Sequence, residues 1–284
     1  MDDPARNAEL ALLLEVAGTP KPGNVDRCRD FDDLRFEQFL AGAVGSRDGL
    51  DRAANGTAVG PAFERAIEGM ATHGENTQFG ALLLLVPLVR AARTDLSQPV
   101  VESVVEGTTV ADAAAFYRAF DHVDVFVADP PDELDPLDVR RGGDAVPELE
   151  KRGLTLFDVM EHSVPGDDVA REWVRGFDRS FTAAERLAVA DEDEPLTDRT
   201  AAVFLTLLAE RPDTLVAKRH GEEIAAEVTD RAASLVDRKA LDTDPAAVDA
   251  FADELVDRGV NPGTTADLTA AGLFIALEHE RIDL

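Results

Sequence analysis

Three junctions between loops and predicted helices hold the residues of this sequence that could do chemistry. The first is a Pro-Lys-Pro-Gly turn at residues 20–23, which contains Lys21. Prolines on either side of Lys21 make the turn stiff and extended, which fixes the position from which the Lys21 side chain extends. An ammonium group held in this way suits a phosphate oxygen. Glu15 precedes the turn and Asp26 follows it, and both could bind Mg²⁺ or act on a proton. The alternative is a capped helix end with solvated charges.

The second junction leads from polar residues at 74–78 into an apolar segment at 81–86. Polar side chains this close to an apolar segment are expected near the core, where they need hydrogen-bond partners. A ligand or a metal could supply those partners, and the free N–H groups of a helix start favour an anion. Asn76 and Thr77 are therefore candidates for ligand binding, and an N-cap that serves only its own helix is the alternative.

The third junction, residues 261–268, reads Asn-Pro-Gly-Thr-Thr-Ala-Asp-Leu. Glycine and hydroxyl groups at a helix N-terminus favour anion binding, which makes Gly263, Thr264 and Thr265 candidates for phosphate contacts. Asp267, in the first turn of the predicted helix, could bind a cation or interact favourably with the helix dipole.

The remaining chemistry-bearing residues indicate no site. His73 and His220 lack metal-ligand spacing and are expected to be solvated or capping. Cys28 has no histidine nearby and is expected to be inert; as the single cysteine, it excludes an intrachain disulfide. The sequence has neither a P-loop nor a dinucleotide fingerprint, so a nucleotide would have to be held in another way.

Helices are expected to position these junctions. Apolar residues recur at helical spacing along most of the chain. Residues of capping type mark helix ends at Asp3, Thr109, Thr182 and Gly259, and Thr264 or Thr265 is expected to cap the last helix. We predict an all-α fold of roughly ten helices, forming a single compact multi-helix domain over residues 1–284.

Three segments have a specific predicted structure. Residues 81–86 are apolar on every face and predict a buried central helix. Residues 122–127 alternate weakly and are the only strand candidate. Residues 129–143 are rich in Pro, Asp and Gly and predict a long exposed loop.

The composition excludes several partners. With 28 Lys plus Arg against 57 Asp plus Glu, the net charge is -29. A surface this acidic repels phosphate backbones and anionic lipids, so we expect neither nucleic-acid binding nor membrane docking.

The high content of acidic residues with few lysines predicts adaptation to molar salt, which screens the repulsion between carboxylates. An ordinary acidic protein is the alternative. We expect no signal peptide, because no long apolar run follows a basic N-terminus, and the longest apolar stretch is too short to span a bilayer. This predicts a cytoplasmic protein.

Taken together, the three junctions resemble the triphosphoribosyl-dephospho-CoA synthase family. The motifs Glu-Val-x-x-x-Pro-Lys-Pro-Gly-x-Val-Asp, Gly-x-Asn-Thr and Pro-Gly-x-x-Ala-Asp-Leu occur in this order over residues 15–268. The resemblance implies an all-helical transferase that moves the triphosphoribosyl group of ATP to 3′-dephospho-CoA and releases adenine. It also implies Mg²⁺ as the cofactor.

The resemblance implies roles for the candidate residues. Breaking the bond between the sugar and the base builds oxocarbenium character on the sugar, which calls for carboxylates nearby. Glu15, Asp26 and Asp267 would fill these catalytic roles, and Glu15 and Asp26 would also be the Mg²⁺ ligands. The implied nucleotide-binding set is Lys21, Asn76, Thr77, Gly263, Thr264 and Thr265.

Two departures from the family pattern leave the acceptor open. Bacterial members usually continue Asn-Thr with His-Lys-Gly, where this chain has Gln78-Phe79-Gly80, and they usually have Gly-Ser where it has Thr264-Thr265. In this the chain resembles a divergent archaeal branch. One alternative is a related ribosyl or phosphoribosyl transfer, or nucleotide hydrolysis, in another cofactor pathway. Another is a non-catalytic helical scaffold. A homo-oligomer is left open.

Overall fold

The computed structural model describes residues 3–71, 76–130, 132–190 and 194–282. His73 and the start of the second junction, Gly74 and Glu75, lie outside the described residues. Over the described ranges the chain consists of helices and loops without a β-strand, and one isolated bridge joins Asp26 and Arg29. The prediction of an all-α fold is confirmed.

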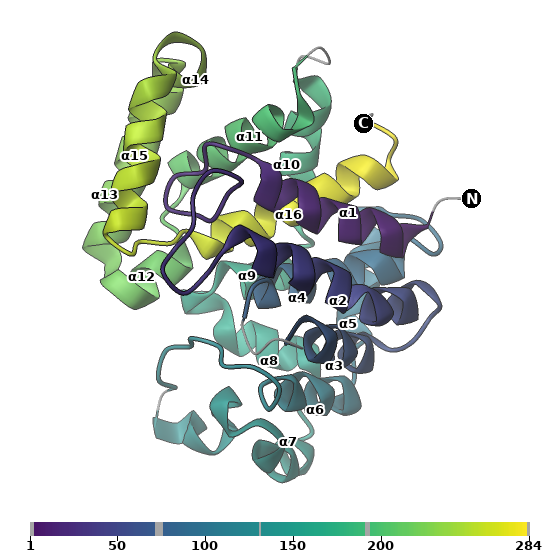
Figure 1. Ribbon diagram of the computed structural model, residues 1–284. Helices are drawn as coiled ribbons and strands as arrows, with labels where there is room; N and C mark the ends of the chain where they lie inside the picture. The colour runs from purple at the N-terminus through teal and green to yellow at the C-terminus, as the bar shows by residue number, and fades with distance from the viewer. Residues whose placement is uncertain (1–2, 72–75, 131, 191–193, 283–284) are drawn as a thin grey trace.

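The helices follow one another in three stretches of the chain (Figure 1). The first stretch comprises α1 (Pro4–Ala17), α2 (Phe36–Ala54), α3 (Val59–Met70), α4 (Phe79–Ala91), α5 (Gln98–Glu106) and α6 (Val110–Ala119). The second comprises η2 (Asp132–Leu137), η3 (Val139–Ala145), α7 (Val146–Arg152), α8 (Leu156–Ser163), η4 (Val164–Gly166), α9 (Asp168–Val174) and α10 (Asp178–Val189). The third comprises α11 (Leu196–Glu210), α12 (Thr214–His220), α13 (Glu222–Asp237), α14 (Ala240–Thr243), α15 (Pro245–Asp257) and α16 (Gly263–Glu278).

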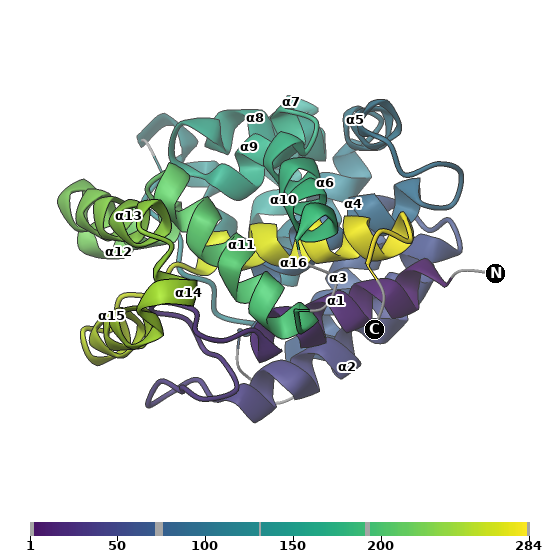
Figure 2. The ribbon, with the colours of Figure 1, turned by 90° about the horizontal axis from the view of Figure 1, so that it is seen from above.

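Two apolar helices run through the middle of the molecule. Residues 81–86 lie in α4 and are all buried, as their unbroken apolar character predicts. Helix α16 packs against α1, α4, α10 and α11, and Figure 2 shows it crossing the centre between them. Gly272 allows the close contact with α10, because a Cβ at this position would lie 2.6 Å from the Cβ of Ala183. The predicted buried central helix is confirmed, and α16 runs beside it.

Apolar side chains gather in a main core and a smaller core. The main core is built around α4 and α16, and the smaller one is formed by α11 to α15 with the start of α16. Helix α16 contributes to both, with Leu273 in the first and Ala266 in the second. A single domain over residues 1–284 stays a prediction, with which this shared helix agrees. Nowhere in the described part of the chain is there a helix that could cross a bilayer.

The helix ends agree only in part with the expected capping residues. The Asp3 carboxylate accepts from Arg6 N at the start of α1, and Thr109 forms the capping box that opens α6. Gly259 follows α15 with φ +66°, a left-handed conformation that suits glycine. Thr182, however, lies inside α10, where its hydroxyl donates to the Asp178 carbonyl at 2.9 Å. The prediction that Thr182 starts a helix is wrong, because the helix already begins at Asp178.

Two further segment predictions are wrong for the same physical reason. Residues 122–127 form no strand, and their alternation is one of burial, with Val123 in the main core and Val125 packed against it. Residues 129–143 do not form a long exposed loop, since they contain η2 and most of η3. Tyr117 holds this segment in place by donating its hydroxyl to the Leu137 carbonyl at 2.7 Å. In both segments, contacts with the helical body decide the structure.

Candidate active site

The three junctions, far apart in sequence, meet around one cavity of about 270 Å³. The turn after α1 and the start of α16 are joined directly, because Asn24 Nδ2 donates to Asn261 Oδ1 at 3.0 Å. The start of α4 and the end of α12 complete the wall. The sequence-predicted site residues that line the cavity are Glu15, Asn76, Thr77, Gly263, Thr264 and Asp267. Lys21, Asp26 and Thr265 are not among its lining residues.

Lys21 is fully buried beneath the cavity wall. Its ammonium contacts the Glu15 carboxylate, donates to Asn24 Oδ1 at 3.0 Å, and lies 5.8 Å from the centre of the Phe204 ring. A buried ammonium with these partners neutralises and orients Glu15. The role of Lys21 in binding phosphate stays a prediction, and this geometry does not favour it.

Asp26 fixes the shape of the turn. Its Oδ2 accepts from Thr19 Oγ1 at 2.8 Å, from Lys21 N at 3.1 Å and from Arg29 Nη1 at 3.2 Å. Its Oδ1 accepts from Cys28 N at 2.8 Å. Since both oxygens have partners inside the protein and the side chain is fully buried, the catalytic and metal-binding roles of Asp26 stay predictions that its contacts do not favour.

Of the two predicted Mg²⁺ ligands, only Glu15 lines the cavity, so a joint metal site with Asp26 stays a prediction that this geometry does not favour. Over the described residues, no group of three or more His, Cys, Asp and Glu side chains is arranged to hold a metal ion.

Asp267 is the second carboxylate of the cavity, opposite the start of α4. A Cβ on Gly80 would lie 2.1 Å from Asp267 Oδ2, so glycine is required there for the carboxylate to approach. Burial is the main cause that raises the pKa of Asp267 well above its ordinary value, and the nearby charges of Glu15, Asp213 and Asp167 raise it further. Asp267 therefore tends to hold a proton.

Glu15 differs from Asp267 because a cation lies against it. Burial raises the pKa of the Glu15 carboxyl, and the Lys21 ammonium opposes this rise. Asp167 also lines the cavity. Glu15 and Asp267 thus lie in unequal environments, an arrangement that separates a proton donor from a proton acceptor.

The first turn of α16 is held by Asp213, a buried residue that the sequence analysis did not identify. Asp213 Oδ2 accepts from the backbone N and the hydroxyl of Thr265, at 2.7 and 2.8 Å. The prediction that Thr264 or Thr265 is an N-cap is wrong, because α16 begins at Gly263 and both threonines lie in its first turn. The hydroxyl and the backbone N of Thr265 are thereby bonded to Asp213, whereas Thr264 lines the cavity.

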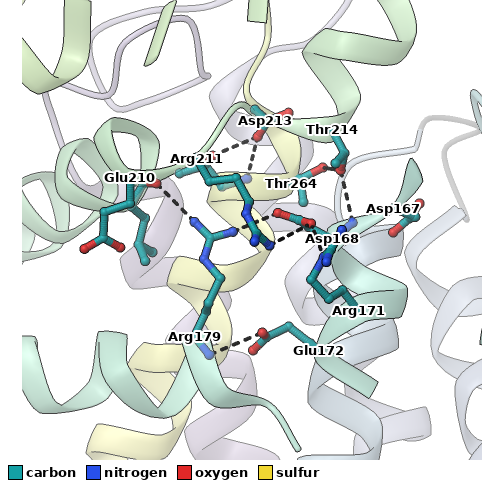
Figure 3. Close-up of polar contacts among 12 residues, drawn as sticks. Asp167, Asp168, Arg171, Glu172, Arg179, Glu210, Arg211, Asp213, Thr214 and Thr264 are labelled. Atoms are coloured by element: carbon teal, nitrogen blue, oxygen red, sulfur yellow. Dashed lines mark hydrogen bonds and ion pairs between the residues drawn. The ribbon is translucent and has the colours of Figure 1, made fainter. Parts of the chain in front are cut away.

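A polar network connects Thr264 with α9 (Figure 3). The Thr264 and Thr214 hydroxyls lie 3.1 Å apart, and Asp168 N donates to Thr214 Oγ1 at 3.2 Å. The buried Asp168 carboxylate in turn binds three guanidinium groups, those of Arg171, Arg179 and Arg211. This cluster fixes the start of α9, where the N-cap residue Asp167 reaches the cavity.

The cations that line the cavity are Lys218 and Arg219, in the last turn of α12, and the sequence analysis missed both. Lys218 Nζ lies 2.5 Å from Asp167 Oδ2, and the Arg219 guanidinium lies 4.8 Å from the centre of the Phe126 ring. A signal existed, since a Lys-Arg-His sequence at a helix C-terminus is conspicuous in a chain with so few lysines. The neighbouring His220 contacts the Gly259 carbonyl at 3.1 Å, which agrees with a capping role.

Aromatic rings form the apolar wall of the cavity. Phe79 and Phe120 lie 4.9 Å apart between ring centres, and Phe116 lies 5.3 Å from Phe120. All three line the cavity, together with Phe39 and Phe126. Flat apolar faces near carboxyl groups and cations suit a purine nucleotide, which combines an aromatic base with a sugar and phosphates.

Comparisons with known proteins show which family the chain is similar to. A crystal structure of a proposed triphosphoribosyl-dephospho-CoA synthase from Archaeoglobus fulgidus is similar, with a TM-score of 0.66 and 28% sequence identity. The similarity covers 86% of this chain and 98% of that one. No curated protein matches the sequence significantly. The model of the CitG family, described as ATP:dephospho-CoA triphosphoribosyl transferase, matches residues 1–283, and the chain therefore belongs to this family of transferases.

Proposed function

We propose that the protein transfers the triphosphoribosyl group of ATP to 3′-dephospho-CoA and releases adenine. The observation that carries this proposal is the convergence of the three family motifs on one cavity, which is lined by the carboxyl groups of Glu15 and Asp267 and by two cations. The carboxyl groups of Glu15 and Asp267 suit the reacting sugar. Lys218 and Arg219 supply positive charge for phosphates.

The two carboxyl groups have complementary roles in this reaction. The bond between C1′ of ATP's ribose and the adenine nitrogen breaks, and a ribose hydroxyl of the acceptor forms a new bond to C1′. Asp267 gives its proton to the departing adenine, as its raised pKa supports. Glu15 stabilises the positive charge that develops on the sugar and takes the proton of the attacking hydroxyl. Return of that proton to Asp267 restores the starting state.

The buried Lys21 acts through Glu15 in this proposal. Its ammonium contacts the Glu15 carboxylate and keeps that group available as an anion inside the protein. Asn24, which accepts from Lys21 and donates to Asn261, holds the same unit against the start of α16. Lys21 is thus a positioning residue.

We propose that Mg²⁺ enters with ATP as the counter-ion of its triphosphate. Magnesium sites of this kind need only one or two protein carboxylates besides the substrate phosphates. Glu15 and Asp267 are the acidic residues of the predicted set that line the cavity. The ion would add positive charge next to the phosphates.

The proposed reaction is tested by measuring adenine released from ATP with and without dephospho-CoA, at high salt and with magnesium present. We expect release to require dephospho-CoA and the product mass to equal the sum of the substrates less adenine. Release without dephospho-CoA would instead support nucleotide hydrolysis. Absence of release with any acceptor, together with absence of ATP binding, would support a scaffold.

We also propose that the protein is adapted to high salt. The net charge of -29 with only four lysines supports this proposal, because molar salt screens the repulsion between carboxylates. The unfolding midpoint should rise between low and molar KCl. A midpoint that does not change over this range would contradict the proposal.

A further inference from the structure

A second cavity, of about 490 Å³, adjoins the first. It is lined by the end of α6, the segment 127–130, η2, η3, α8 and the end of α12. In Figure 1, α6, α7 and α8 lie together at one end of the molecule. The two cavities share the lining residues Val127, Val139, Val159, Ser163, Asp167 and Lys218, so they are neighbours that one ligand could span.

The interior of the second cavity is mainly apolar. Leu137, Leu154 and Val159 contribute aliphatic surface, and the Tyr117 ring lies beside them with its hydroxyl already bonded to the Leu137 carbonyl. Its lining also includes the polar groups of Arg152 and His162 and the carboxylates of Asp129 and Asp138, which both pair with Arg140. Such a site suits an extended chain that is largely aliphatic, with a few polar groups, better than it suits a nucleotide.

The boundary between the cavities carries an ion pair. Lys218 and Asp167 line both cavities and contact one another at 2.5 Å, with 20% and 32% of their side chains exposed. Asp167 is fixed as the N-cap of α9, where its Oδ1 accepts from Ala170 N at 3.0 Å. A ligand that passes from one cavity to the other must therefore pass an ammonium held in a defined position, which suits a phosphate group.

The volume of the first cavity also indicates that the two substrates need a second binding region. Ligand sites typically have volumes of about 300–1,000 Å³, and the first cavity, at about 270 Å³, lies just below that range. The proposed reaction brings two nucleotides together, one of which carries a long arm beyond its diphosphate. A cavity that encloses the reacting sugar leaves that arm to be bound elsewhere.

We infer that the second cavity binds the pantetheine arm of the acceptor, with Lys218 at the boundary contacting the acceptor's diphosphate. The inference rests on the proposed function for the identity of the acceptor. Arg219 lines only the first cavity and serves the triphosphate of ATP. The arm thereby determines which nucleotide enters as the acceptor and which as the donor.

The test compares dephospho-CoA with ADP, which has the same adenosine diphosphate without the arm. Titration calorimetry at high salt should give an affinity at least about tenfold higher for dephospho-CoA than for ADP. Leu154→Trp fills the second cavity and should remove most of this difference while leaving the affinity for ADP unchanged. Lys218→Met should weaken both ligands by a similar factor, about tenfold, because both carry the diphosphate.

Two controls separate binding from folding. Val189→Trp adds the same ring to a side chain that is 83% exposed on α10 and should change neither affinity. If Leu154→Trp does not fold, Leu154→Phe adds less volume and should show the same ordering with a smaller loss. A folded Leu154→Trp protein that binds dephospho-CoA as the wild type does would overturn the inference.

The outcomes for the inference and for the proposed function are distinct. Acceptor-dependent adenine release with an unchanged KM for dephospho-CoA in Leu154→Trp would uphold the function and overturn the arm site. A selective loss of dephospho-CoA affinity in that variant, without adenine release by the wild type, would uphold the arm site and overturn the function.

Discussion

The turn after α1 and the end of α12 both present basic residues close to the cavity, but they use them differently. In the turn, Lys21 is fully buried against Glu15 and Asn24, and Arg29 binds Asp26, Asp249 and Asp253. At the end of α12, Lys218 contacts Asp167 and stays partly exposed, and Lys218 and Arg219 both line the cavity. The comparison teaches that the more conspicuous motif lies behind the cavity and positions a carboxylate, whereas the less conspicuous one places its cations on the cavity surface.

The largest expected effect concerns Asp267, which lies where the two regions meet. Asp267→Asn keeps the shape of the side chain but removes the transferable proton, so kcat should fall by about 10²–10⁴-fold with little change in the KM for ATP. Steady-state assays of adenine release measure this. Asp249→Asn, outside the cavity, is the matched control and should keep nearly full activity. A similar kcat for Asp267→Asn and wild type would exclude Asp267 as the proton donor.

Lys21→Met tests whether the turn is structural. The variant leaves Glu15 buried without its cation, and the free energy of unfolding should fall by about 3–5 kcal/mol. Lys218→Met is the matched control and should lose about 1 kcal/mol, because its partner Asp167 is partly exposed. Denaturant unfolding measures both. Unchanged stability of Lys21→Met together with a raised KM for ATP would break the comparison and restore Lys21 as a phosphate ligand.

Arg219→Gln tests whether the basic end of α12 binds the triphosphate. The side chain is exposed at the mouth of the cavity, so its loss should leave stability unchanged and raise the KM for ATP about tenfold. Arg52→Gln, on the outer side of α2, is the control and should leave the KM for ATP at its wild-type value. An equal KM for Arg219→Gln and wild type would remove Arg219 from the triphosphate site.

The smallest expected effect is a difference in the pH dependence of stability. Because the pKa of Asp267 is raised in the folded protein, its carboxyl group keeps a proton to higher pH there than in the unfolded chain, so this group favours folding at low pH. That contribution is lost as the pH rises through the raised pKa of Asp267. Asp267→Asn should therefore lose less stability than wild type as the pH increases, by at most about 1.4 kcal/mol per pH unit. Parallel pH curves would show that Asp267 is ionised in the folded protein.

The sequence alone was sufficient to predict those features of the fold and the site that neighbouring residues determine. The unbroken apolar character of residues 81–86 predicted α4, and Thr109, as a residue of capping type, predicted a capped helix. The order of the motifs predicted that Glu15, Asn76 and Asp267 belong to one site, and all three line the cavity.

Tertiary contacts decide the features that the sequence analysis missed. The burial of Lys21 depends on Phe204 in α11, which no spacing near the turn indicates. Thr265 does not line the cavity, and its hydroxyl and backbone N are hydrogen-bonded to Asp213, which lies 52 residues earlier in the chain. The alternation of Val123, Val125 and Val127 has the period of a strand, but it arises from packing against helices and a cavity.

The position of Asp213 has a mechanical consequence. Its Oδ1 accepts from Leu215 N and Val216 N at the start of α12, while its Oδ2 holds the first turn of α16. One side chain therefore joins the N-termini of two helices, so a change in the orientation of α12 would also move α16. The distance between the basic end of α12 and Asp267 is consequently set by the protein itself, before any ligand binds.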